Sequence, residues 1–190
     1  MFPKGTLLRF DTPVMELSVY AGEFGSGYCL ALIHSFLLDL GSSPGGWSQV
    51  ASEIIVDGKI LSIDNKNMDK LENVNFIMDD INNEELILKV QKFFNKKIDV
   101  VVSDMAANTT GNKNLDSFRT GELCINAMYL ARYVLSENGV FLAKAFMGSI
   151  FEEIHKNAKK YFKKVIKYKP LSSKNESKEI YLFCKDVLNI

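Results

Sequence analysis

Three carboxylates fall where a sheet of parallel strands would bring a ligand. Asp64, Asp80 and Asp104 each stand at or just past the carboxyl end of a predicted strand. In open α/β sheets, ligands bind beyond these ends, where the strand order reverses. A carboxylate after the second strand suits the hydroxyls of a ribose, and Asp80 suits the amino group of an adenine. One such acid is commonplace on a surface, but three on one rim indicate a site.

A glycine-rich turn precedes these acids. The apolar run Phe36–Leu40 predicts a buried strand, and a helix is expected to open near Trp47 after the intervening residues GSSPGG. Glycine lets the backbone approach a ligand closely, and the free N–H groups of a helix start point to the same place. The spacing matches neither GxGxxG nor GxxxxGK[ST]. A plain strand-to-helix connection therefore explains the turn equally well.

Lys144 is a lone lysine inside an apolar strand, FLAKAF at 141–146. A lysine in this setting can lie at a sheet edge, with its stem along apolar surface. Buried instead, it would lose its proton more easily, because burial disfavours the ammonium. Lys144 is therefore a candidate proton acceptor.

Lysines recur at helical spacing along one face of a predicted helix and continue beyond it. They are Lys156, Lys159, Lys160, Lys163, Lys164 and Lys167. A charged helix face is most often simply solvated. Because Lys+Arg and Asp+Glu both number 23, such clustering makes the molecule electrostatically polar. A phosphate-contacting surface is the functional alternative, and the pattern alone leaves both open.

Strands and helices alternate from Ser35 onward, which predicts an α/β fold with a mostly parallel, seven-stranded sheet. The predicted strands are 36–40, 59–63, 74–78, 98–103, 139–146, 164–168 and 178–184. The predicted helices are 48–56, 83–95, 116–136 and 150–162. No helix separates the last two strands, so they should pair antiparallel at one edge. Residues 1–31 contain several glycines and a proline and show no clear pattern.

Composition excludes several classes of protein. A chain of 190 residues suits one domain. Cys29, Cys124 and Cys184 are far apart and odd in number, which favours a reducing cytosol over a disulfide framework. The sequence has only two histidines, which argues against a histidine-rich metal centre or a Ser-His-Asp triad. The sequence predicts neither a signal peptide nor a membrane span.

Four segments resemble the FtsJ family of S-adenosylmethionine-dependent RNA 2′-O-ribose methyltransferases. They are DLGSSPGGWSQ at 39–49, VVSDMAANTTGNKNLDSFR at 101–119, VLSENGVFLAKAFMG at 134–148 and KPLSSKNESKEIY at 169–181. Their order and spacing fit the family over about 36–186. The resemblance implies a Rossmann-like methyltransferase fold, with helices on both faces of the sheet and a methyltransferase domain at 32–190 behind an atypical segment at 1–31.

The resemblance also implies S-adenosylmethionine as cofactor and S-adenosylhomocysteine as product. The turn after the first strand, Gly45 and Trp47 in particular, would line the methionine end. Asp64 would take the ribose hydroxyls, and Asp80 with Ile81 would take the adenine. The full set of implied cofactor residues is Gly41, Ser42, Pro44, Gly45, Gly46, Trp47, Asp64, Asp80, Ile81 and Asp104.

Catalysis in the family uses a Lys-Asp-Lys-Glu set, whose last three members match Asp104, Lys144 and Glu179. Neutral Lys144 would accept the proton of a ribose 2′-hydroxyl, with Asp104 orienting it and Glu179 holding the lysine or the ribose. The implied substrate is uridine in large-subunit ribosomal RNA, modified by a monomer in the cytoplasm or an organelle, with no membrane contact. The lysine pattern supplies the predicted RNA contacts Lys156, Lys160 and Lys163, and the resemblance adds Lys174, which stands where the family has an arginine.

The family's first lysine has no counterpart by position. It would fall near Tyr20, and no lysine occurs between Lys4 and Lys59. Either Lys4 or Arg9 replaces it, or the site works with three residues, or activity is reduced. A second hypothesis is therefore a cofactor-binding, RNA-interacting protein with weak or no catalysis. A third, a methyltransferase for a small molecule or a protein, leaves the lysines unexplained.

Overall fold

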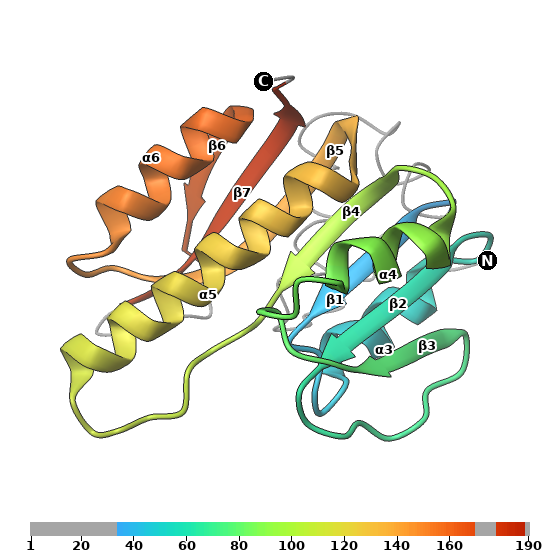
Figure 1. The fold of residues 1–190 in the computed structure, drawn as a ribbon, viewed down its shortest axis with the longest axis horizontal. Helices are drawn as coiled ribbons and strands as arrows, with labels where there is room; N and C mark the ends of the chain where they lie inside the picture. Colours follow the sequence, from blue (N-terminus) through green and yellow to red (C-terminus); the bar gives the residue numbers. More distant parts are fainter. Residues whose placement is uncertain (1–33, 170–177, 189–190) are drawn as a thin grey trace, which may run out of the picture.

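The computed structural model describes residues 34–169 and 178–188, which form one sheet covered by helices (Figure 1). The predictions for 1–31 and Lys174 lie outside the described residues. Across the sheet the strand order is β3-β2-β1-β4-β5-β7-β6. The strands are β1 (Phe36–Leu40), β2 (Lys59–Asp64), β3 (Val74–Met78), β4 (Ile98–Ser103), β5 (Leu135–Phe146), β6 (Phe162–Tyr168) and β7 (Glu179–Val187).

Strands β1 to β5 run parallel, and β7 runs antiparallel to both of its neighbours. The predicted α/β class and the antiparallel pairing of the last two strands at one edge are confirmed. β6 is the outermost strand, and β7 lies inside it, beside β5. The order reverses between β1 and β4, so the carboxyl ends of the parallel strands meet at a topological switch point.

The helices cover both faces of the sheet, as predicted. They are α3 (Gly46–Ile54), α4 (Leu86–Phe94), α5 (Lys113–Val134) and α6 (Phe151–Tyr161). α3 packs on one face, and α4, α5 and α6 pack on the other (Figure 1). Within the described residues, no helix is both long and apolar enough to cross a membrane.

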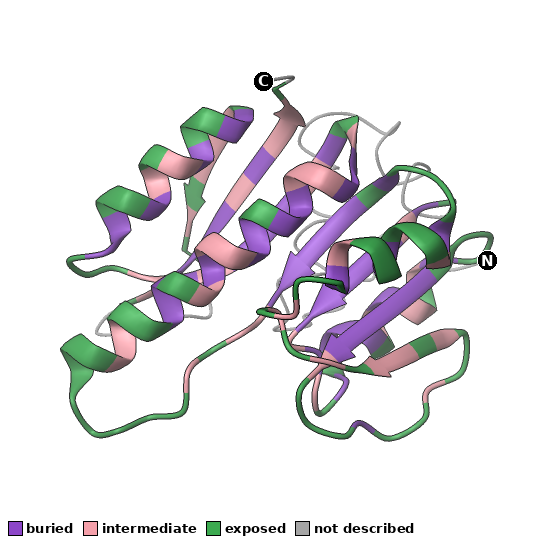
Figure 2. Cartoon of the chain, in the orientation of Figure 1, coloured by how far each residue is buried: buried purple, intermediate pink, exposed green. Residues whose placement is uncertain are grey.

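The central strand β4 is buried on both sides (Figure 2). Val101 belongs to the larger hydrophobic core beneath α5, whereas Val100 and Val102 belong to the smaller core beneath α3. Because alternate residues of a strand point to opposite faces, a continuous run of β-branched residues is what such a strand requires.

All four helices begin at residues other than those predicted, and the shifts of α4 and α5 arise because side chains hold the preceding backbone in turns. α4 begins at Leu86 rather than Asn83, since Asn83 Oδ1 accepts the N–H of Glu85 at 3.0 Å. α5 begins at Lys113 rather than Asp116, since the Asn112 side chain caps the N–H groups of the next turn. Asx turns and caps of this kind are decided by local side-chain geometry.

Candidate active site

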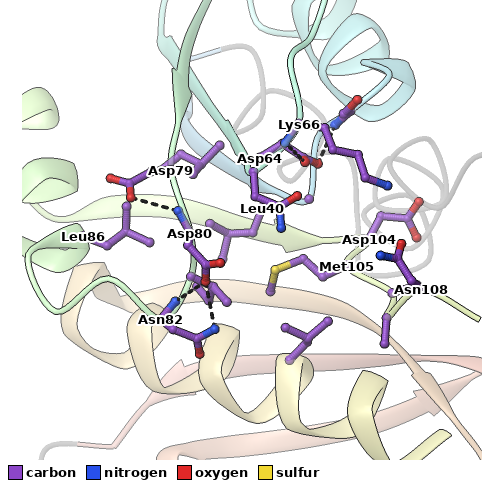
Figure 3. A pocket seen from close by; sticks show the side chains of 18 of the residues that line it. Leu40, Asp64, Lys66, Asp79, Asp80, Asn82, Leu86, Asp104, Met105 and Asn108 are labelled. Carbon is purple, nitrogen blue, oxygen red and sulfur yellow. Dashed lines mark hydrogen bonds between the residues drawn. The ribbon is translucent and has the colours of Figure 1, made fainter. Parts of the chain in front are cut away.

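A cavity of about 530 Å³ opens at the carboxyl ends of β1, β2 and β4 (Figure 3). The predicted site residues that line it are Gly41, Asp64, Asp80, Ile81, Asp104 and Lys144. The lining residues that the sequence did not single out include Ser43, Lys66, Asn82, Met105, Asn108 and Leu123. Lys66, Asn82 and Met105 follow a predicted acid within two positions, a signal that could have found them. Leu123, on α5, is brought in by packing alone.

Gly41 lets the turn after β1 close tightly over the end of β4. Its φ is +76°, and a Cβ there would lie 2.5 Å from Met105 Cγ and 2.9 Å from the Met105 backbone. The turn is held by two backbone hydrogen bonds, from the Gly41 N–H to the Ile63 carbonyl and from the Asp104 N–H to the Leu40 carbonyl. Only glycine meets both conditions, a left-handed backbone and no side chain.

Asp64, at the end of β2, is fixed by the backbone on both sides of the cavity mouth. Its Oδ2 accepts the Ser43 N–H at 2.9 Å, and its Oδ1 accepts the Lys66 N–H at 2.8 Å. Each carboxylate oxygen has a second lone pair. The side chain is therefore oriented in advance and keeps acceptor capacity for a pair of hydroxyl donors.

Two adjacent acids follow β3, and the structure separates their roles. Asp79 is engaged by Lys89 Nζ at 2.8 Å and by Asn83 Nδ2 at 2.8 Å. Asp80 uses Oδ1 to accept two hydrogen bonds from Asn82 (Figure 3). Because Asp79 has an internal cation as its partner, Asp80 is the acid better able to meet a ligand from this side.

Asp104 and Lys144 form an ion pair at the cavity wall, with Lys144 Nζ 2.6 Å from Asp104 Oδ1. Only 13% of the Lys144 side chain and 34% of the Asp104 side chain are exposed. Burial raises the pKa of the Asp104 carboxyl; the Lys144 ammonium opposes this shift, and the Glu179 carboxylate adds to it. The pair is therefore a partly desolvated site at which a proton can be held or moved.

The register of β7 against β5 places Glu179 near the Asp104–Lys144 ion pair. Lys144 pairs with Tyr181 across the β5–β7 ladder, and Glu179 stands two residues before Tyr181 on the same face. The Tyr181 hydroxyl donates to Glu179 Oε1 at 3.0 Å. The three predicted catalytic residues thus meet at one corner of the sheet, although Glu179 is not among the described residues that line the cavity.

Trp47 lies in the core beneath this corner. It is 8% exposed, and its ring packs against Tyr181 with centroids 6.0 Å apart. It does not line the cavity, nor do the other predicted turn residues Ser42, Pro44, Gly45 and Gly46. Their contact with a cofactor stays a prediction, whereas support of Tyr181 is a role for Trp47 that the sequence did not suggest.

Asp39 is a buried acid for which the sequence pattern predicts no role. It is fully buried in β1, and its Oδ2 accepts the Ser48 hydroxyl at 2.5 Å; Ser48 Oγ in turn lies 2.6 Å from Ser62 Oγ. Burial raises the pKa of Asp39 to about 7, although the Ser48 hydrogen bond lowers it. A lone acid in the apolar run FLLDL was the available signal.

The predicted RNA-contacting lysines Lys156, Lys160 and Lys163 are exposed on α6 and β6. Lys163, near the start of β6, lies toward the opposite end of the sheet from the cavity. The adjacent Lys164 pairs with Lys185 on β7, and Lys185 pairs with Val140 on β5. Val140 stands four residues before Lys144 on the same strand. That offset is roughly 13 Å along the strand. Contacts there would engage RNA away from the reacting group.

A family model described as FtsJ-like methyltransferase matches residues 29–187. The chain belongs to the FtsJ-like methyltransferase family. The resemblance drawn from the four sequence segments is thereby confirmed, and the match spans the cavity and all three corner residues.

Curated relatives and solved structures agree with this FtsJ-like assignment. Ribosomal RNA large subunit methyltransferase E of Pelagibacter ubique is 46% identical over 149 residues, which are 78% of this chain and 73% of the relative. A Plasmodium falciparum protein assigned as a ribosomal RNA methyltransferase has a structure with TM-score 0.77 and 29% identity, covering 93% of this chain and 97% of that one.

More distant neighbours of this FtsJ-like methyltransferase share the fold alone. Human methyltransferase-like protein 13, solved in complex with SAH, has a TM-score of 0.60 at 13% identity. The match covers 83% of this chain and 78% of that one. The Rossmann-like methyltransferase fold is therefore confirmed.

Proposed function

We propose that this protein transfers a methyl group from S-adenosylmethionine to a ribose 2′-hydroxyl, that of a uridine in large-subunit ribosomal RNA. The observation that carries the proposal is the partly buried Asp104–Lys144 pair, 2.6 Å apart, on the wall of a cavity whose other end holds Asp64 and Asp80. The relatives named as ribosomal RNA methyltransferases support the choice of substrate.

The residues around the cavity fit S-adenosylmethionine. Asp64 retains acceptor capacity for two ribose hydroxyls, and Asp80 has an oxygen to offer the adenine amino group. Ile81 and Leu123 supply apolar surface for the adenine ring, and Gly41 keeps the backbone close to the cavity. When bound, this cofactor supplies an electrophilic methyl group on a sulfonium sulfur.

We assign the proton of the attacking 2′-hydroxyl to Lys144 Nζ, acting in its neutral form. Asp104 fixes the position of Nζ, and Glu179 fixes the lysine or the ribose from the β7 side. With the cofactor bound, the oxygen would take the methyl group in line as the carbon–sulfur bond breaks, leaving S-adenosylhomocysteine. Alignment of reacting groups is worth roughly 7–11 kcal/mol, and a general base contributes about 10²–10⁴ in rate.

RNA is the partner that the charge pattern favours. Lys156, Lys160 and Lys163 are exposed and could contact phosphates. A ribosomal substrate sets the reaction in the cytoplasm, or in an organelle with its own ribosomes.

A second candidate is a cofactor-binding, RNA-interacting protein with weak or no catalysis. It is favoured by one observation, the absence of a lysine between Lys4 and Lys59 where the family places its first catalytic lysine.

Methyl transfer to large ribosomal subunits decides between the two candidates. Tritium from labelled S-adenosylmethionine should appear in RNA with the wild-type protein, and Lys144→Ala should lower the rate by about 10²–10⁴. Lys92→Ala, which removes an exposed lysine on α4, is the matched control and should act like wild type. A wild-type rate no higher than that of Lys144→Ala, with cofactor binding intact in calorimetry, would establish the non-catalytic candidate instead.

A further inference from the structure

A second cavity, of about 280 Å³, lies where the start of α5 meets the turn between β5 and α6. Its lining includes Lys113, Asn114, Ser117, Phe146, Met147 and Lys178. None of these residues has a part in the function proposed above. The first turns of α5 extend beyond the sheet at this point and are largely exposed (Figures 1 and 2).

This cavity adjoins the reacting corner. Phe146 is two residues beyond Lys144 on β5 and on the same face, a step of roughly 7 Å. The turn is tied to β7, because the Met147 N–H donates to the Lys178 carbonyl at 2.8 Å. A chain whose ribose reached Lys144 would therefore place its next unit in or beside this cavity.

The lining combines cationic and apolar groups. Lys113 and Lys178 are exposed amines from two different elements, and Met147 is 43% exposed beside Phe146. On the neighbouring positions of α5, Phe118 is 44% exposed. Large apolar side chains left in contact with water beside lysines are typical of surfaces on which nucleic-acid bases stack while the backbone meets cations.

The acid that lines the cavity is occupied by its own loop. Asp116 Oδ1 accepts hydrogen bonds from the Thr110 N–H and hydroxyl, at 2.8 and 2.7 Å. These bonds lower the pKa of Asp116. The carboxylate is therefore held toward the loop, and the two lysines supply the mobile charges that a phosphate would meet.

We propose that this cavity binds a nucleotide that flanks the methylated one, its base against Phe146 and Met147 and its phosphate near Lys113 and Lys178. The inference rests on the proposed function, since it requires an RNA strand at Lys144. If so, the cavity between the start of α5 and Lys178 contributes to substrate recognition, in addition to the lysines of α6 and β6.

The test compares Lys113→Ala/Lys178→Ala with Lys70→Ala/Lys92→Ala, which removes two exposed lysines outside both cavities. We expect the first double variant to raise KM for large ribosomal subunits about ten-fold, with kcat within about two-fold of wild type. In filter binding to ribosomal RNA, its salt slope should fall by about 0.7–0.9, the change expected for one lost phosphate contact. The control pair should change neither quantity.

A second comparison tests the apolar wall. Met147→Glu should weaken RNA binding at least as much as the lysine double variant, whereas Leu88→Glu, on α4 and also exposed, should not. If wild type methylates RNA but both cavity variants behave like their controls, the flanking site is ruled out and the proposed function stands. If wild type transfers no methyl group to RNA, the proposed function fails and the inference fails with it.

Discussion

Tyr181 stands directly opposite Lys144 in the β5–β7 ladder and donates its hydroxyl to Glu179 at 3.0 Å. Trp47 supports the tyrosine ring from α3. One aromatic side chain thus connects α3, the lysine of β5 and the glutamate of β7, and it makes Glu179 a positioned group rather than a free surface acid.

Loss of the Tyr181 hydroxyl should therefore lower catalysis more than binding. Tyr181→Phe keeps the ring against Trp47 and removes a hydrogen bond to a carboxylate, worth about 1.5–3 kcal/mol. We expect kcat to fall several-fold, with KM and the cofactor Kd nearly unchanged. Tyr129→Phe, which removes a hydroxyl hydrogen bond on the surface of α5, is the control for single-turnover kinetics. Equal kinetics for the two variants would contradict the positioning role.

Substitution of Gly41 tests the tight turn over β4. Gly41→Ala places a methyl group 2.5 Å from Met105 Cγ and strains a φ of +76°, so both overpacking and backbone strain should appear. Together these cost roughly 2–5 kcal/mol. Gly111→Ala is the matched control, because its φ is +87° but no atom lies within 4 Å of the added carbon. Urea unfolding should show a larger loss in the free energy of unfolding for Gly41→Ala than for Gly111→Ala. Equal losses would mean that Met105 moves aside at no cost.

Asp80 should matter for cofactor affinity. Removing its carboxylate in Asp80→Ala takes away the acceptor assigned to the adenine amino group. A hydrogen bond to a charged group is worth about 1.5–3 kcal/mol, so Kd in calorimetry should rise ten-fold or more. Asp57→Ala, whose side chain is 86% exposed beside His34, is the control. Unchanged affinity in Asp80→Ala would remove the assignment of the adenine to this end of the cavity.

Asp39 should make stability fall as pH rises through the weakly acidic range. Its pKa is about 7 in the folded protein against 3.8 for the ordinary group, so between these values the folded state holds the extra proton. The free energy of unfolding then declines by up to about 1.4 kcal/mol per pH unit from this one group. This decline in the free energy of unfolding begins near pH 4 and is complete above about pH 7.

Asp39→Asn removes the titration while keeping an oxygen for Ser48. Its buried amide can lower stability at every pH, so the slope between pH 4.5 and 6.5 is the measurement, taken by urea unfolding. We expect a smaller decline than in wild type, whereas Asp57→Asn should keep the wild-type slope. An unaltered slope in Asp39→Asn would show that this carboxyl is already ionised across that range.

Elements with strong local patterns were predicted closely. The bounds of β1, β3 and β4 match the predicted residues, because an apolar run between turn residues defines each. Boundaries that depend on side-chain hydrogen bonds were less accurate, as at Asn83 before α4 and Asn112 before α5. Whether such a side chain caps a helix or closes a turn depends on geometry that hydrophobic periodicity does not carry.

The sequence by itself determined the fold class, the family and the acids at the strand ends. These depend on short stretches, since a strand end and the turn that follows it are neighbours in the chain. Only the tertiary structure decided which distant residues meet. It inserted β7 beside β5, in the register that sets Tyr181 against Lys144, and it placed Trp47 beneath that tyrosine rather than at the cavity. Strand order and register come from packing between elements far apart in the chain, and a local pattern holds no information about that packing.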